Sequence, residues 1–150
     1  MQVVSIREAA EEDVAAVLDL YRAAGIGGED NFTVEEGIAH FAALKRASSL
    51  RLFVAVIDGS IVGTYELMVM DNMAKAGKRS GVVEDVAVSP DHQGQGVGRA
   101  MMVHALEECR KSGCYKLMLS SNLKREEAHR FYEALGFKRH GYSFQVEVSG

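Results

Sequence analysis

The fold is decided by the stretch Gln93-Gly94-Gln95-Gly96-Val97-Gly98, which lies between an apolar run at Val82–Val88 and a helical pattern that begins at Arg99. A strand, a glycine loop and a helix in this order are typical of a phosphate-binding site. Glycine has no Cβ atom, so backbone N–H groups of the loop can converge on an anion. The helix end adds unpaired N–H donors and a partial positive charge. The stretch therefore predicts a ligand that carries phosphate.

The same stretch excludes two familiar phosphate loops. A dinucleotide-binding GxGxxG motif would need its third glycine at position 99, which is Arg99. A P-loop needs a lysine and a hydroxyl residue at the start of its helix, and Val97-Gly98-Arg99-Ala100 has neither. What remains is the pattern Gln-x-x-Gly-x-Gly between a strand and a helix.

Length and composition predict a single domain over residues 1–150, because 150 residues of which 47% are hydrophobic suffice for one core. A net charge of −4 argues against a nucleic-acid partner. We expect no membrane partner either, since no apolar run approaches the roughly 18 residues of a membrane span. The N-terminus lacks the pattern of a signal peptide, so a cytoplasmic protein is expected.

The cysteines and histidines do not predict a metal site. The spacing of Cys109 and Cys114 is not one that zinc sites use, and we expect both to be reduced packing residues. His104 and Cys109 share a helical pattern but miss the i, i+4 face that holds a metal. His92 begins the glycine loop, where it could touch phosphate.

Apolar and β-branched runs predict strands along the chain. The runs Leu52–Ile57 and Ile61–Met70 are joined by Asp58-Gly59-Ser60, which is a hairpin signal. The loop Asp71–Ser80 is polar, and we expect it to be mobile. Further strands are expected at Val3–Ile6, Val82–Val88, Tyr115–Leu119, Phe137 and Tyr142–Val148.

Apolar stripes at helical spacing predict four helices. Thr33-Val34-Glu35-Glu36 has the spacing of a capping box, which marks a helix start, and Gly136 is expected to end the last helix. Strands and helices in this order predict an α/β fold, an αβα sandwich whose mixed, largely antiparallel sheet has helices on both faces. The first helix is expected at Glu11–Ala23, with Val14, Val17, Leu18 and Tyr21 on one stripe. The others are expected after Thr33, at Arg99–Lys111 with Met102, Leu106 and Cys109 inward, and at Glu126–Leu135.

Three blocks of the chain resemble the GNAT superfamily of acyl-CoA-dependent N-acetyltransferases. The blocks are Glu84–Gly98, which contains the glycine loop, Gly113–Leu119, and Ala128–Phe137, which contains Phe-Tyr-x-x-Leu-Gly-Phe. Within the superfamily, the segments Glu84–Val88 and Gly113–Leu117 look similar to the glucosamine-6-phosphate and aminoalkylphosphonate N-acetyltransferases. Together, in this order, the blocks are highly specific for the superfamily.

The resemblance implies a GNAT-like fold and acetyl-CoA as the cosubstrate. Backbone groups of Val86, Ala87 and Val88 would run along the pantetheine arm like an added strand, and Asn122 would contact the same arm. A backbone N–H at a bulge in the Val82–Val88 strand would polarise the thioester carbonyl. The pyrophosphate would be held by the amides of Gln93, Gly94, Gln95, Gly96, Val97, Gly98 and Arg99.

The catalytic candidates are Tyr132 and Glu84. Tyr132 lies on an apolar helical stripe and would be a core residue on pattern alone, but the resemblance implies that it protonates the departing thiolate. Glu84 is expected to help remove a proton from the attacking ammonium, which must lose it before attack. Asp85 should alternate to the other strand face. Glu66 could face the substrate amine or solvent, and solvent is favoured.

The function expected from these features is direct transfer of an acetyl group from acetyl-CoA to a primary amine of a small molecule, without an acyl-enzyme. Two alternatives stay open: a protein or peptide N-acetyltransferase, and a non-catalytic acyl-CoA sensor on the same fold. The sequence carries no recognisable code for the acceptor. Dimers are common in the resembled family, so a homodimer is an expected partner arrangement.

Overall fold

The computed structural model describes residues 2–47, 49–121 and 123–148. The chain forms two compact units, Met1–Met118 and Leu119–Gly150. The first unit holds nearly all of the sheet and three α-helices, and the second holds the last helix and the C-terminal tail.

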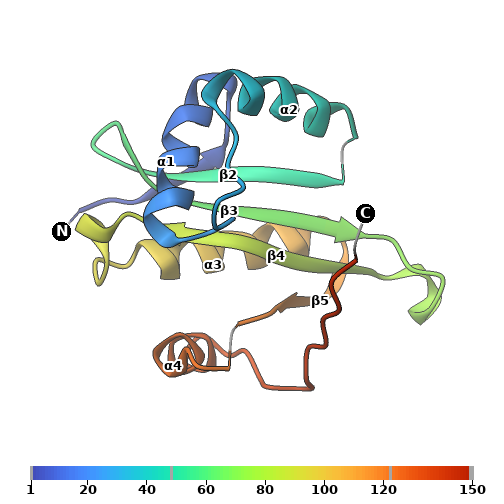
Figure 1. Cartoon of the computed structure of the whole chain (residues 1–150). Coiled ribbons are helices and arrows are strands. Elements are labelled where there is room, and N and C mark those ends of the chain that lie inside the picture. Colours follow the sequence, from blue (N-terminus) through green and yellow to red (C-terminus); the bar gives the residue numbers. More distant parts are fainter. Residues whose placement is uncertain (1, 48, 122, 149–150) are drawn as a thin grey trace. The chain divides into compact units, whose positions relative to one another are not determined.

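One sheet forms the centre of the first unit (Figure 1). Its strands are β1 (Ser5–Glu8), β2 (Leu50–Ile57), β3 (Ser60–Met70), β4 (Arg79–Val88) and β5 (Cys114–Leu119). They stand in the order β1-β2-β3-β4-β5, and each of the first four is antiparallel to its neighbour. A helix connects β4 to β5, which is the kind of crossover that parallel neighbours need. The predicted α/β fold with a largely antiparallel sheet is confirmed.

The hairpin between β2 and β3 forms where the Asp-Gly pair predicts it. Both turn residues have a left-handed backbone, with φ of 48° at Asp58 and 79° at Gly59. Two positive φ angles in succession are what a type I′ turn requires, and its twist matches that of the flanking strands. The pairing then runs from Ile57 opposite Ser60 outward along both strands.

The helices begin and end close to their predicted bounds. They are α1 (Val14–Ala24), α2 (Val34–Ala47), α3 (Val97–Lys111) and α4 (Glu126–Ala134), with short 3₁₀ turns η1 (Glu11–Asp13), η2 (Lys75–Gly77) and η3 (Pro90–His92). The predicted capping box starts α2: the Thr33 N–H donates to Glu36 Oε2 at 3.0 Å, and the Glu36 N–H donates to Thr33 Oγ1 at 3.3 Å. Two otherwise unpaired donors are thereby satisfied.

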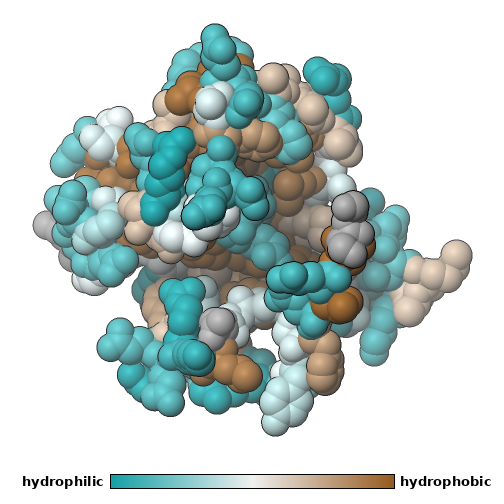
Figure 2. All heavy atoms as spheres, in the orientation of Figure 1, coloured by the Kyte–Doolittle hydropathy of each residue, from teal (hydrophilic) through white to brown (hydrophobic). Residues whose placement is uncertain are grey.

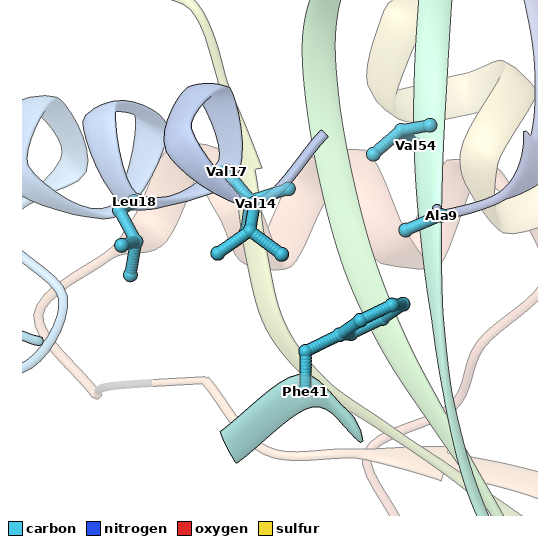
Figure 3. Packing of buried hydrophobic residues seen from close by; sticks show 6 residues of the cluster. All are labelled: Ala9, Val14, Val17, Leu18, Phe41 and Val54. Carbon is cyan, nitrogen blue, oxygen red and sulfur yellow. The ribbon is translucent and has the colours of Figure 1, made fainter. Parts of the chain in front are cut away.

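Helices α1 and α2 cover one face of the sheet with an apolar cluster. Figure 3 shows Val14, Val17 and Leu18 of α1 gathered with Phe41 of α2 and Val54 of β2. All five side chains are buried. The α1 residues of the cluster are those that the helical stripe in the sequence predicts.

Helix α3 covers the opposite face of the sheet. Successive strand residues point to opposite faces, and Phe53, which precedes Val54, contacts the ring of His104 on α3 with centroids 4.9 Å apart. The prediction that Leu106 points inward is wrong, since it is 37% exposed. The buried stripe has four members at four-residue spacing and Met102 beside them, and it bypasses Leu106. Its members are Val97, Met101, Met102, Ala105 and Cys109.

Two glycines allow α3 to lie close to the sheet. A Cβ atom on Gly63 of β3 would stand 2.9 Å from Val97 Cγ1, near the start of α3. A Cβ atom on Gly81 of β4 would stand 2.2 Å from Cys109 Sγ, near its end. Each glycine therefore makes room for one α3 side chain, and together they fix the helix along its length.

The second unit contains α4 and the tail that follows it. The helix ends as predicted: Gly136 has φ of 99°, and the Phe137 N–H donates to the Tyr132 carbonyl at 3.1 Å. The strands predicted at Phe137 and Tyr142–Val148 are wrong, because none forms within residues 123–148. Alternating apolar residues can give a strand one apolar face, but a strand forms only where its backbone hydrogen-bonds to an adjacent strand.

The surface of the molecule mixes polar and apolar residues. Figure 2 shows hydrophilic and hydrophobic residues interspersed over α1 and α2 on the face drawn. Met73 is 99% exposed and lies in the loop between β3 and β4. Across the ranges that the structure describes, no helix is both long enough and apolar enough to cross a membrane.

Candidate active site

The glycine loop of residues 93–96 links η3 to α3. Gly94 has φ of 77° and Gly96 has φ of 83°, a left-handed conformation that residues with a Cβ atom adopt only at a cost. No atom lies within 4 Å of the position that a Cβ would take at either glycine. The two glycines are therefore needed for the path of the backbone, and the space beside them is open.

The start of α3 is fixed onto the sheet. Val97 is 1% exposed, and its side chain lies over Gly63. Because this side chain points into the core, Val97 can offer a ligand only its backbone. The first N–H groups of a helix have no partner within the helix, and this end carries partial positive charge. The loop and the helix start can thus bind an anion through backbone donors.

His92 adds a polar group at the start of the loop. Its Nδ1 atom is buried and has no hydrogen-bond partner among the residues that the structure describes. A buried polar atom without a partner is costly, and a phosphate oxygen could satisfy it. The Gln95 Nε2 donates to the Asp91 carbonyl at 3.3 Å and so closes the turn. On these observations the loop fits a diphosphate group.

Strand β4 carries a bulge a few residues before the loop. Thr64 pairs with Ala87 and Glu66 pairs with Glu84, so two residues of β4 stand opposite one residue of β3. One of the two, Asp85, has φ of 51°. The bulge expected in this strand is therefore present. A bulge interrupts the ladder and leaves backbone groups available to a ligand.

Glu66 meets two acidic residues and a tyrosine beside this bulge. The Tyr21 hydroxyl of α1 donates to Glu66 Oε1 at 3.4 Å. Burial, and then the carboxylate of Asp85, raise the pKa of Glu66 to about 7. The Tyr21 hydroxyl lowers it by less, and Glu84 makes the smallest contribution, which raises it. Two predictions are wrong here: Glu66 is partly buried and does not face solvent, and the bulge turns Asp85 toward it.

The predicted catalytic residues belong to different units. Glu84, in the first unit, is exposed on β4 directly before the bulge residue Asp85. Tyr132, in the second unit, contacts the rings of Phe131 and Phe137 with centroids 5.2 and 5.8 Å away. Burial raises the pKa of Tyr132, against a lowering by Arg125. The Tyr132 hydroxyl therefore keeps its proton at neutral pH.

The predicted coenzyme-binding residues of the first unit follow one another along the chain. Val86, Ala87 and Val88 form the end of β4, where Ala87 and Val88 pair with β3. The segment from Gln93 to Arg99 contains the loop and the first turn of α3. Asn122 lies outside the described residues. The roles of all these residues remain predictions.

Sequence reasoning missed the contact between Tyr21 and Glu66. Tyr21 is predicted as an apolar stripe residue of α1, and the two positions are 45 residues apart in the chain. Two signals could have indicated it. A buried tyrosine usually needs a partner for its hydroxyl, and Glu66 is the one charged residue in the run Ile61–Met70.

A comparison with known protein families assigns the chain. It matches the model of the Acetyltransferase (GNAT) family over residues 14–137. The chain therefore belongs to the GNAT acetyltransferase family, and it is an enzyme of that family. Acetyl-CoA is the cosubstrate in this family. The resemblance seen in the sequence is confirmed.

Individual relatives support this assignment. The chain is 33% identical to the glucosamine 6-phosphate N-acetyltransferase of Trypanosoma brucei brucei over 74% of this chain and 75% of that protein. It is 30% identical to the aminoalkylphosphonate N-acetyltransferase of Salmonella typhimurium over 96% of this chain and 91% of that protein. A solved putative acetyltransferase from Agrobacterium tumefaciens has a TM-score of 0.89 and 31% identity, and the match covers 96% of this chain and 99% of that one.

Proposed function

We propose that this chain is an N-acetyltransferase that moves an acetyl group from acetyl-CoA to a primary amine of a small molecule by direct transfer. The observation that carries the proposal is the left-handed glycine loop in front of α3, in a chain that belongs to the GNAT family. The bulge of β4 beside it gives the second half of the site. The two unpaired cysteines, Cys109 and Cys114, suit a cytoplasmic enzyme.

In this proposal the cosubstrate lies along β4 and ends at the loop. The amides from Gln93 to Arg99 hold the diphosphate, and the His92 ring contacts one of its oxygens. The backbone of Val86–Val88 runs beside the pantetheine arm, and Asn122 contacts the same arm. Backbone donors suit this task because they are fixed by the fold and lose little freedom when the ligand binds.

The chemistry then needs three kinds of group. An ammonium with a pKa of about 10.4 has no lone pair at neutral pH, so Glu84 assists the removal of its proton. A backbone N–H at the β4 bulge donates to the thioester oxygen as negative charge develops there. Tyr132 gives its proton to the sulfur that leaves. Most of the acceleration comes from holding the amine and the thioester in line.

The proposed acceptor is a small amine that also carries an oxyanion. The two relatives are named for glucosamine 6-phosphate and for aminoalkylphosphonates, and both names describe an amine beside a phosphorus oxyanion. Lys75, Lys78 and Arg79 are exposed along the loop before β4 and at its first residue. These cations are our candidates for the group that attracts the acceptor's oxyanion.

A thiol-release assay with acetyl-CoA and a panel of amines tests the proposal. The panel contains glucosamine 6-phosphate, an aminoalkylphosphonate, their analogues without phosphorus, and a peptide with a free N-terminal amine. We expect turnover with the small amines and a faster rate for each phosphorus-bearing member of a pair. Binding of acetyl-CoA without thiol release across the panel would indicate a sensor. Preference for the peptide would overturn the assignment of a small acceptor.

A further inference from the structure

The partly buried carboxyl group beside the β4 bulge has no role in the mechanism above. We infer that Glu66 is a further catalytic residue of the proposed acetyl transfer, which accepts the proton of the acceptor ammonium while Tyr21 positions it. This inference rests on the proposed function and adds a residue to the same site. Glu84, which is exposed at the edge of the site, draws the ammonium in and assists the transfer.

The geometry places Glu66 against the bulge and against α1 at once. Glu66 and Glu84 are partners in the β3–β4 register, so they stand directly opposite each other. The Tyr21 hydroxyl reaches Glu66 from α1 at 3.4 Å and limits the positions of its carboxyl group. The bulge brings the Asp85 carboxylate close enough to Glu66 to raise its pKa.

All of the titratable groups that act on Glu66 are acidic. They are Tyr21 of α1 and both Glu84 and Asp85 of β4, while its β2 partner Leu52 is apolar. None of the ion pairs between described residues involves Glu66, Glu84 or Asp85. Nor do these three form a metal-holding group, since no such cluster occurs within the described ranges. A bound ammonium would bring positive charge to this acidic group.

Acetyl transfer at this site begins with removal of a proton from the acceptor. Glu66 in its ionised form takes one proton from the ammonium, which leaves a neutral amine with a lone pair. The nitrogen forms a bond to the acetyl carbon, the carbon–sulfur bond breaks, and the sulfur leaves with the electron pair and the proton of Tyr132. The nitrogen loses its second proton to solvent, Tyr132 regains one from solvent, and Glu66 releases its proton between turnovers. The base is active only when ionised, so the rate should rise with pH.

The pH profile of kcat/KM tests this inference, because it reports the essential groups of the free enzyme. Wild type should show a rising limb near pH 7, where burial and acidic neighbours hold the pKa of Glu66. The pH at which kcat/KM rises should be the same for two acceptor amines with different pKa values, because the rise belongs to the enzyme. Glu66→Gln should lower kcat/KM by about 10²- to 10⁴-fold and remove the limb. Glu107→Gln, on the exposed side of α3, is the matched control and should change neither.

Two further variants separate Glu66 from its neighbours. Glu84→Gln should raise KM but keep the limb. Tyr21→Phe deletes only the hydroxyl whose hydrogen bond lowers the pKa of Glu66, so the limb should move to higher pH. The inference is overturned if Glu66→Gln keeps the limb, or if Glu84→Gln alone removes it. Should Glu66→Gln fail to fold, an unmoved limb in Tyr21→Phe overturns it. Wild type that turns over no amine rejects the proposed function instead.

Discussion

Tyr132 shows how one residue can satisfy two patterns at once. It belongs to the apolar stripe of α4, and its ring contacts Phe131 and Phe137 as a core residue would. Burial also raises the pKa of its hydroxyl, so the proton needed by a departing thiolate is present at neutral pH. Pattern alone favours the packing role. The acid role is our proposal, and a variant without the hydroxyl separates the two.

Tyr132→Phe should lower kcat by about 10- to 100-fold and leave KM for acetyl-CoA nearly unchanged, since the ring and its packing are retained. Steady-state thiol release measures both constants. Tyr142→Phe is the control, because Tyr142 is 82% exposed in the same unit. An unchanged kcat in Tyr132→Phe would remove the acid role while leaving the packing role in place.

Some residues of the candidate site could be predicted from the sequence, and others could not. The glycine loop and Glu84 can be found from local pattern, because neighbours along the chain define them. The hydrogen bond from Tyr21 to Glu66 cannot be found in this way, because it depends on how α1 lies against β3. The position of Asp85 depends on one extra residue in β4, and the period-2 rule fails wherever such a bulge occurs.

Among the elements, α3 depends most on one close approach to the sheet. A Cβ atom at Gly81 would stand 2.2 Å from Cys109 Sγ and 3.1 Å from Leu117 Cδ1. Both neighbours belong to packed elements, α3 and β5, so neither can move freely. The spacing between β4 and α3 is therefore set by the absence of a side chain.

Gly81→Ala should lower the free energy of unfolding by about 1–3 kcal/mol through overpacking. Chemical denaturation followed by circular dichroism measures this value. Adding Cys109→Ala should recover part of the loss, because the two residues share one space. Gly141→Ala is the control, since no atom lies within 4 Å of its added Cβ and its φ is not left-handed. A stable Gly81→Ala variant would contradict the close packing of α3.

Turns and helix ends were predicted best, because their sequence signals act within a few residues. The Asp-Gly turn, the capping box at Thr33 and the C-cap at Gly136 all form as expected. The tail at Tyr142–Val148 has an equally clear alternation, yet it forms no strand within the described residues. A strand needs a neighbour that its own sequence does not contain, and this is why the last prediction failed.

For the whole molecule, the family assignment and the proposed chemistry meet at one feature, the backbone path of the loop before α3. The fold brings β4, its bulge and this loop into one continuous segment of the first unit. We propose that main-chain N–H groups around Gly94 and Gly96 bind the diphosphate of acetyl-CoA. Composition and charge cannot test this claim, because they are ordinary for a globular chain.

Calorimetric titration of acetyl-CoA into the wild type, Gly96→Val and Gly113→Val tests it most directly. Both glycines have a left-handed φ and open space beside them, 83° at Gly96 and 76° at Gly113, but only Gly96 lies in the loop. We expect Gly96→Val to bind acetyl-CoA about 10-fold more weakly or worse, and Gly113→Val to bind it like wild type. Acetyl-pantetheine, which lacks the diphosphate, should bind weakly to all three proteins. No uptake of acetyl-CoA by the wild type, or equal affinity in Gly96→Val, would contradict the account.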